Sequence, residues 1–303
     1  MHKQSFLTGV AYMLLSAIGL SIVGLFGKLA QENISLTALV FYRFSSAFVL
    51  CLLLYLLIGR IKKSFGSYPV KINILRTVFV LGAQYCFYSY IQKGSLLNGM
   101  ALLNTGPIFM PFIEKVFLGN RIGRSTWISI LVSFVGVLMI LQPDSGILSK
   151  ASLLGLSAGI FQAGSQVIFG VHSRDENIEL SILVLFALCA VTSFIPFVLS
   201  SPTLVSFKVH EGYMLFLVLG LAVGSIFNQL SRAEAYKHST PSRLASFLYF
   251  AVILAGIYDW MIFKITPNVL SCVGAGLVIL GGILKIVLRS KALSAQEKKI
   301  PPV

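Results

Sequence analysis

Charged residues are scarce in this sequence. Only 11% of its 303 positions are Asp, Glu, Lys or Arg, whereas an average soluble domain has about a quarter. This deficit excludes an intrinsically disordered chain and an ordinary cytosolic enzyme. Hydrophobic residues instead make up 56% of the chain, and no connecting segment is long enough to hold a soluble domain. The composition therefore predicts a protein embedded in a membrane, with lipid as one of its partners.

Cysteines and catalytic motifs are also few or missing. The four cysteines all lie in apolar segments, which predicts reduced, packed thiols rather than a disulfide framework or a metal site. There is no H-E-x-x-H zinc motif, no G-x-S-G, no P-loop and no pair of intramembrane aspartates. An intramembrane enzyme, as the alternative class, would need such a nucleophile or metal set. We therefore predict a protein that is not an enzyme and has no cofactor and no metal.

Basic residues outnumber acidic ones, 24 to 10, which gives a formal net charge of +14. A nucleic-acid-binding protein would gather these charges on a soluble face, but here they lie between apolar segments, which is how membrane topology is encoded. With the N-terminus in the cytoplasm, most of them fall on the cytoplasmic side, Arg76 and Arg232 among them. We therefore predict no nucleic-acid partner, cytoplasmic N- and C-termini, and a cytoplasmic tail over 291–303.

Charge-free segments indicate how often the chain crosses the membrane. A charged side chain at the bilayer centre costs a few kcal/mol, so spans should be free of charge. Ten such windows occur, at 4–27, 44–59, 77–92, 94–113, 125–143, 151–173, 180–207, 212–231, 244–258 and 265–284. A helix needs about 20 residues to cross, so the second must extend backwards through Arg43 to about Leu36. The sequence predicts an all-α polytopic membrane protein with ten transmembrane helices.

The two halves of the sequence resemble each other. An offset of 145 aligns Gln84 with Gln229 and Glu114 with Asp259. Apolar helices align easily by chance, but several Gly, Gln and acidic matches at one offset favour duplication. We predict two five-helix repeats, 1–145 and 146–290. Because five is odd, the second repeat is inverted, a design typical of secondary transporters.

Arg43 is the residue that most clearly breaks the hydrophobic pattern. It lies about seven residues into the second predicted helix, roughly 10 Å deep. It could hold an anionic group of a substrate, or its side chain could extend to the outer interface. We favour the buried role.

Other polar side chains recur at helical spacing within the predicted spans. Each could hydrogen-bond across helices, and together they predict a polar, aromatic-rimmed cavity. With Arg43, the predicted substrate-binding residues are Gln84, Tyr85, Tyr88, Asn104, Gln162, Gln166, Asn228, Gln229 and Tyr249.

Glu114 and Asp259 are equivalent in the two repeats, yet they fall at opposite faces of the membrane. We take them as candidate residues of symmetric inner and outer gates. The alternative is an interfacial carboxylate beside a basic neighbour, such as Lys115 next to Glu114.

The chain resembles the drug/metabolite transporter superfamily, specifically its ten-helix EamA-type members. The segments that carry the resemblance are Phe41-Tyr42-Arg43-Phe44, Leu103-Asn104-Thr105-Gly106-Pro107, Phe117-Leu118-Gly119-Asn120, Gly136-Val137-Leu138, Ala235 to Ser242, Tyr249 and Gly281-Gly282. Members usually have a Gly-Glu pair after the fourth and ninth helices, where this chain has Gly119-Asn120 and Lys264-Ile265, so that glutamate's role does not transfer. The resemblance implies a monomer in the bacterial inner membrane that moves small organic molecules.

Together, the residues and the resemblance predict a secondary transporter that works by alternating access. One fixed cation in an aromatic cavity suits an amino-acid-like or other zwitterionic or anionic solute. The alternatives are an S-adenosylmethionine-type uptake transporter, and a lipid-linked flippase or partner subunit.

Overall fold

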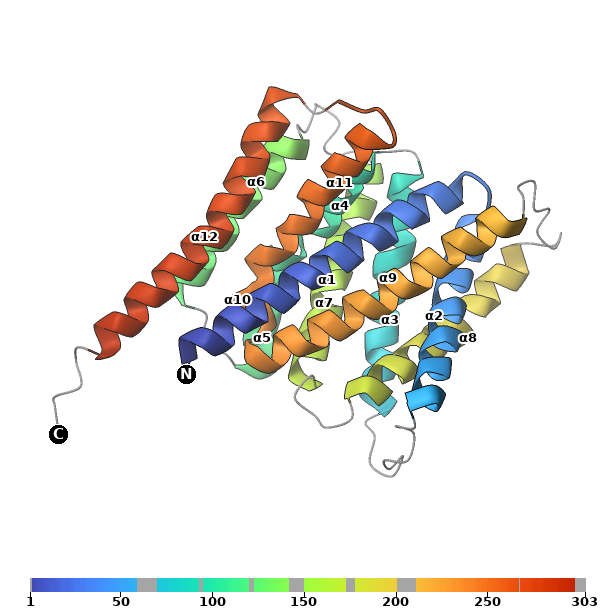
Figure 1. Cartoon of the computed structure of the whole chain (residues 1–303), viewed down its shortest axis with the longest axis horizontal. Coiled ribbons are helices and arrows are strands. Elements are labelled where there is room, and N and C mark those ends of the chain that lie inside the picture. Colours follow the sequence, from blue (N-terminus) through green and yellow to red (C-terminus); the bar gives the residue numbers. More distant parts are fainter. Residues whose placement is uncertain are drawn as a thin grey trace.

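The computed structural model describes residues 2–58, 70–92, 95–119, 123–141, 150–172, 178–200, 211–266 and 268–297. In these residues the chain forms helices joined by short turns (Figure 1). The helices are α1 (His2–Gln31), α2 (Leu36–Ile58), α3 (Val70–Ile91), α4 (Leu96–Leu103), α5 (Gly106–Leu118), α6 (Arg124–Leu141), α7 (Lys150–His172), α8 (Ile178–Ser200), α9 (Glu211–His238), α10 (Pro241–Leu244), the 3-10 helix η2 (Ala245–Tyr249), α11 (Phe250–Met261) and α12 (Val269–Glu297).

These helices make ten membrane-crossing units, as the sequence predicts. In the described residues seven stretches are long and apolar enough to span a membrane, and two of them, Leu96–Phe117 and Pro241–Met261, each combine several short helices. The other three units are α6, α12 and α3, the last of which contains Lys71 and Arg76. The second span begins at Leu36, so Arg43 lies inside α2. The prediction of an all-α polytopic membrane protein is confirmed.

The main helix pairs join the first half of the chain to the second. Helix α1 packs along α9 and α3 packs along α7, while α6 with α12 and α2 with α8 form pairs at the two edges of the bundle (Figure 1). Side chains from both halves therefore meet throughout the core.

Two of the ten units are broken, and the breaks have a local cause. The unit formed by α4 and α5 is interrupted at Asn104 and Thr105, directly before Pro107, which has no N–H with which to continue the α4 ladder. The unit formed by α10, η2 and α11 contains a 3-10 turn that ends at Tyr249. Asn104 and Tyr249 are 145 residues apart, the offset of the predicted repeat. The breaks thus recur at the spacing that the repeat requires.

Glycines allow close packing where α6 meets α12. A Cβ added at Gly136 would lie 2.5 Å from the backbone oxygen of Gly274, and one at Gly281 would lie 2.9 Å from that of Ser129. The two backbones therefore touch at these positions, and a larger side chain at either would force them apart.

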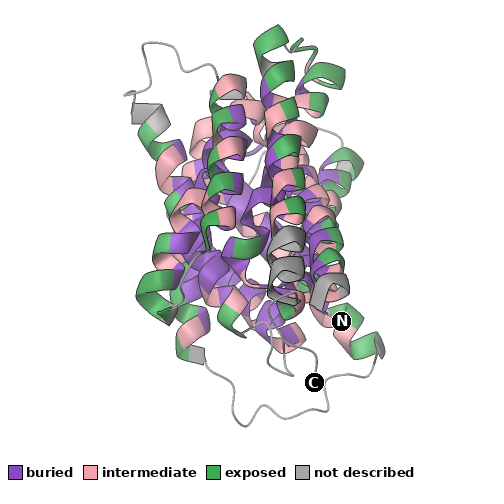
Figure 2. Cartoon of the chain, turned by 90° about the vertical axis from the view of Figure 1, so that its left-hand side faces the viewer, coloured by how far each residue is buried: buried purple, intermediate pink, exposed green. Residues whose placement is uncertain are grey.

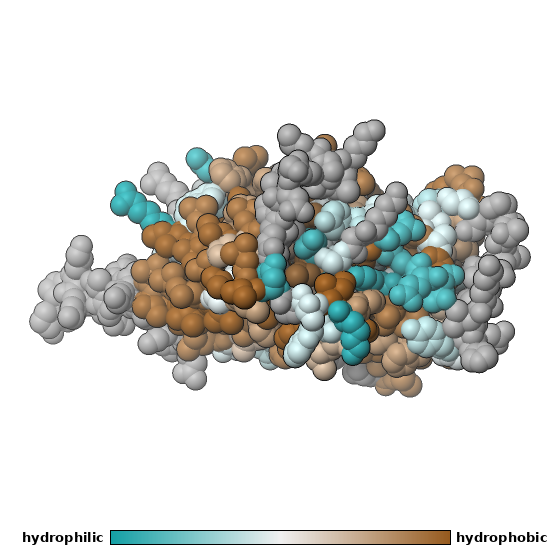
Figure 3. Space-filling view, turned by 90° about the horizontal axis from the view of Figure 1, so that it is seen from above, coloured by the Kyte–Doolittle hydropathy of each residue, from teal (hydrophilic) through white to brown (hydrophobic). Residues whose placement is uncertain are grey.

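The outer surface of the bundle is apolar and its interior contains polar groups. Large hydrophobic side chains such as Leu57, Leu199 and Val269 are about 80% exposed. Figure 2 shows the buried residues along the middle of the bundle and the exposed ones on its outer faces. Seen from above, hydrophobic residues cover much of the surface and hydrophilic ones gather in one part of it (Figure 3). An apolar exterior of this extent fits a lipid environment.

The four cysteines are free. Cys51 and Cys189 are buried and Cys86 is half-buried, as predicted for packed thiols. Cys272 is exposed, so for this residue the prediction is wrong: it lies on the outer face of α12.

Candidate functional site

Arg43 lies at the centre of a buried polar cluster. Its Nε donates to Ser225 Oγ at 3.2 Å, and its Nη1 donates to Gln84 Oε1 and to the Tyr88 hydroxyl, the latter at 3.3 Å. The guanidinium carbon is also 5.9 Å from the centroid of the Tyr88 ring. Arg43 is 7% exposed, so it does not extend to an interface. We call Arg43, Gln84, Tyr88 and Ser225 the central cluster.

The central cluster has a positive charge and neutral partners. An amide and two hydroxyls accept hydrogen bonds from Nε and Nη1 of Arg43, but they do not cancel its charge. Neither of the ion pairs in the described part of the chain, Lys28–Asp259 and Lys237–Glu234, includes Arg43. A buried charge of this kind is costly unless an opposite charge approaches it. The cluster is therefore suited to receiving an anionic group.

Helix α9 extends the polar region from the central cluster towards the end of the bundle where α1 begins, which we call the N-terminal end. Ser225, Gln229, Arg232 and Tyr236 follow one another at spacings of three or four residues, so they share a face of the helix, and Asn228 adjoins Gln229 on it. Arg232 is buried, and its Nε donates to Ser16 Oγ at 3.3 Å. A second buried guanidinium thus comes from the helix that also supplies Ser225 to Arg43.

The structure adds two arginines that the sequence reasoning missed. Arg76 and Arg232 were expected at the cytoplasmic side because they lie at the edges of charge-free windows. Both are buried within helices, α3 and α9, and not at a surface. Arg76 donates from Nη2 to Gln229 Oε1 at 2.9 Å, and its guanidinium stacks 3.7 Å from the centroid of the Phe169 ring. The helical spacing of Arg232 from Gln229 was the signal that could have found it.

Gln166 and Tyr236 close the polar region towards α7. The Tyr236 hydroxyl donates to Gln166 Oε1 at 2.6 Å, and its ring meets that of Phe169 edge to face. Gln162 is buried one turn before Gln166 on the same helix. The predicted residues Gln84, Tyr88, Gln166 and Gln229 thus belong to one polar region with the three buried arginines.

Other predicted binding residues lie elsewhere or are used locally. Asn104 donates to Met100 O at 2.8 Å, inside the break between α4 and α5. Tyr249 is fully buried in a separate apolar cluster with Val137, Val252 and Val278. Asn228 donates to Ser16 at 2.6 Å (backbone oxygen) and 3.1 Å (hydroxyl), which joins α9 to α1.

Tyr85 stands apart from the central cluster. It is half-buried on α3 and packs against the main hydrophobic core. Its hydroxyl has no hydrogen-bond partner within the described residues.

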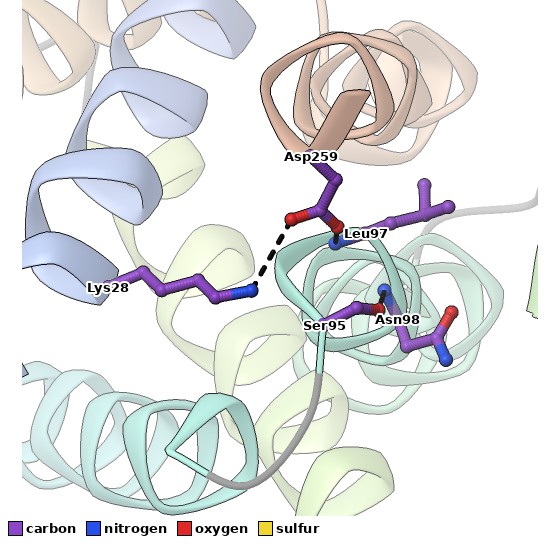
Figure 4. A network of polar contacts seen from close by, with 5 residues as sticks. All are labelled: Lys28, Ser95, Leu97, Asn98 and Asp259. Carbon is purple, nitrogen blue, oxygen red and sulfur yellow. Dashed lines mark hydrogen bonds and ion pairs between the residues drawn. The ribbon is translucent and has the colours of Figure 1, made fainter. Parts of the chain in front are cut away.

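At the end of the bundle away from the N-terminus, Asp259 joins three helical segments (Figure 4). One carboxylate oxygen is 3.3 Å from Lys28 Nζ on α1, and the other accepts from the Leu97 backbone N–H at 2.7 Å. The nearby Ser95 caps α4 by accepting from Asn98 N–H at 3.1 Å. Asp259 of α11 thus satisfies a free N–H at the start of α4, where a negative charge is favoured.

Glu114 makes the equivalent contact at the N-terminal end. It is fully buried, and it accepts from the Ser242 backbone N–H at 2.9 Å and from the Ser242 hydroxyl at 2.5 Å. Its partner is therefore the start of α10 and not the neighbouring Lys115. Leu97 and Ser242 are 145 residues apart, as are Glu114 and Asp259. Each broken unit therefore supplies the carboxylate that holds the first turn of the other.

The polar region contains donors suited to a solute rather than ligands suited to a metal ion. Within the described residues, no group of three His, Cys, Asp or Glu side chains is placed to hold a metal. Guanidinium, amide and hydroxyl groups instead bind carboxylates, phosphates and other polar atoms. The arrangement can recognise and orient a polar solute inside the membrane.

Comparison with known proteins places this geometry in a family. Residues 7–142 match the EamA-like transporter family. The pseudopaline exporter of Pseudomonas aeruginosa is 26% identical over 90% of this chain and 93% of its own length. The riboflavin transporter of Vibrio cholerae is 26% identical over 92% of each chain. The S-adenosylmethionine uptake transporter of Rickettsia felis is 21% identical over 97% of this chain and 98% of its own.

A solved crystal structure shares the fold. It superposes with a TM-score of 0.70 and covers 95% of this chain and 99% of its own, at 15% sequence identity. The relatives are named as transporters or exporters and not as enzymes. The chain is thus a transporter of small solutes in the membrane, and its residues 7–142 are similar to the EamA-like transporter family.

Proposed function

We propose that the protein is a secondary transporter of an amino-acid-like or other zwitterionic or anionic solute. It would act in the bacterial inner membrane with both termini in the cytoplasm, and it would work by alternating access. The observation that carries this proposal is the burial of Arg43 among neutral partners. A fixed cation at this depth stabilises an anionic group inside the protein, because the two charges compensate each other there.

The placement of the central cluster supports transport between two halves. Arg43, Gln84 and Tyr88 come from α2 and α3, whereas Ser225 comes from α9. We further propose that 1–145 and 146–290 are inverted repeats, so that the cluster lies between them. Two conformations related by the repeat would then expose one site alternately to the two sides of the membrane.

The contacts of Glu114 and Asp259 support a gate at each end. Each carboxylate holds the first turn of a broken unit from the other half, one at each end of the bundle. Breaking one contact while keeping the other would open one side alone, as alternating access requires.

The relatives leave the identity of the solute open. They are named for pseudopaline, riboflavin and S-adenosylmethionine, three chemically different compounds. S-adenosylmethionine uptake is thus no better supported than the others. A flippase would need polar groups facing lipid, whereas the central cluster is buried.

Counterflow with the purified full-length protein in liposomes tests this function. The panel should contain radiolabelled amino acids, nucleosides and S-adenosylmethionine. At least one solute should exchange, and Arg43→Gln should lower its kcat/KM at least tenfold, because the charged contact is lost. The matched control is Lys285→Gln, which removes a buried cation that binds Thr126 between α12 and α6, outside the polar region. Absence of exchange for a broad panel, or full activity of Arg43→Gln, would contradict the proposal.

A further inference from the structure

The charge of Arg43 is not alone in the polar region. Arg232 is 4% exposed, and like Arg43 it belongs to neither ion pair of the described residues. It binds Ser16 Oγ through Nε, while its Nη2 has no hydrogen-bond partner within the described residues. A buried N–H without a partner is costly, so this atom is placed to receive an acceptor.

The two guanidinium groups are close enough to share one solute. Arg43 binds Ser225, and Arg232 follows Ser225 by two turns of α9, roughly 10 Å. The Arg232 side chain turns back along the helix, since it binds the same Ser16 hydroxyl as Asn228, one turn earlier. The two guanidinium groups therefore both lie along the part of α9 between Ser225 and Arg232, and neither belongs to an ion pair of the described residues.

Two buried like charges raise the free energy of the empty site, and a solute with one anionic group compensates only one of them. Glu114, a buried carboxylate towards the N-terminal end, accepts two hydrogen bonds from Ser242 and belongs to no ion pair with Arg232 in the described residues. A solute with two anionic groups would compensate both guanidiniums and fill the open donor of Arg232.

From these contacts we propose that Arg43 and Arg232 form a two-point anion site, and that the transported solute has two separated anionic groups. The inference rests on the proposed function, since it specifies the solute of the same site. Ser225 lies beside the first point and Ser16 beside the second, so both α1 and α9 would contact the bound solute.

Competition in counterflow tests this inference with pairs of compounds that differ by one charge. Glutamate against glutamine, and succinate against succinamate, have nearly the same size, but only the first of each pair is acidic at both ends. Each diacid should inhibit exchange at a concentration at least tenfold lower than its amide. Arg232→Gln should make the inhibitory concentrations of diacid and amide equal, and Lys285→Gln should keep the preference of the wild-type protein.

The outcomes separate the inference from the proposed function. If the wild-type protein exchanges solutes but amides compete as well as diacids, or if Arg232→Gln retains the preference, the two-point site is wrong and transport stands. If no solute exchanges at all, the proposed function itself fails. The wild-type comparison needs no variant, and Arg232→Lys, which keeps the charge, should keep most of the preference if Arg232→Gln does not fold.

Discussion

At the scale of single residues, hydrogen-bond partners distinguish side chains that hold helices together from side chains that are placed to meet a solute. The side-chain amide of Asn228 binds α1, where it donates two hydrogen bonds to Ser16. Arg43 and Arg232 have charges that no described carboxylate compensates. Residues of the first kind should affect stability, and residues of the second kind should affect transport.

Asn228→Ala tests this distinction. The substitution leaves the Ser16 backbone oxygen buried without this donor, which should cost about 1–3 kcal/mol and lower the melting temperature of the detergent-purified protein. The KM for the transported solute should change less than twofold. Gln92→Ala, at an exposed position, is the control for stability. A raised KM at unchanged melting temperature would instead assign Asn228 to the solute.

The polar residues of the spans could be found from the sequence, but their partners could not. Arg43, Gln84 and Tyr88 do meet, because helical spacing places Gln84 and Tyr88 on one face of α3. Arg76 and Arg232 were missed because the spans were defined as windows without charged residues. Such a window ends at the first charged residue, even when that residue lies on the buried face of the same helix. Tyr249 lies in a separate apolar cluster, because helical spacing alone does not show which neighbour a helix face meets.

At the scale of elements, the helices follow from the sequence more completely than their irregularities do. The ten spans and the start of α2 at Leu36 follow from apolar length and charge. Pro107 lacks the N–H that a continuous helix would use, and the structure has a full break before it. The matching 3-10 turn before Phe250 contains no proline, so the local sequence does not predict this break.

The contact of α6 with α12 gives a prediction at this scale. Gly136→Ala places a Cβ 2.5 Å from the Gly274 backbone oxygen, so the helices must separate, at a cost of about 1–3 kcal/mol. The yield of monodisperse protein and its melting temperature should both fall. Gly276→Ala on α12 is the matched control, because nothing lies within 4 Å of its added Cβ. Equal stability of the two variants would show that the helices do not pack this closely.

At the scale of the whole molecule, the two ends of the bundle are held by related contacts. Asp259 binds Lys28 and the start of α4 at one end, and Glu114 binds the start of α10 at the other. Both contacts are formed in this structure. Under the proposed alternating access, they would break one at a time.

Neutral isosteres of the two carboxylates should therefore open opposite ends. Loss of a hydrogen bond to a charged group costs about 1.5–3 kcal/mol, enough to change a population tenfold. In a background without native cysteines, Glu114→Gln should accelerate labelling of Ser239→Cys, a buried site at the N-terminal end. Asp259→Asn should accelerate labelling of Leu96→Cys, which is buried at the opposite end.

Each substitution serves as the control for the other. Glu114→Gln should leave labelling at Leu96→Cys unchanged or slower, and Asp259→Asn should do the same at Ser239→Cys. Faster labelling at both ends with either substitution would indicate general loosening rather than gates.

The pairing of helices across the two halves also has a consequence for biosynthesis. Helices α1, α2, α3 and α6 leave the ribosome well before their main partners α9, α8, α7 and α12 exist. During that interval Arg43 has no Ser225 to bind, and the glycine-containing face of α6 meets lipid. Helix α12 therefore completes a contact of α6 that stays unformed while the helices between them are synthesised, and truncation within α12 should leave α6 without its partner.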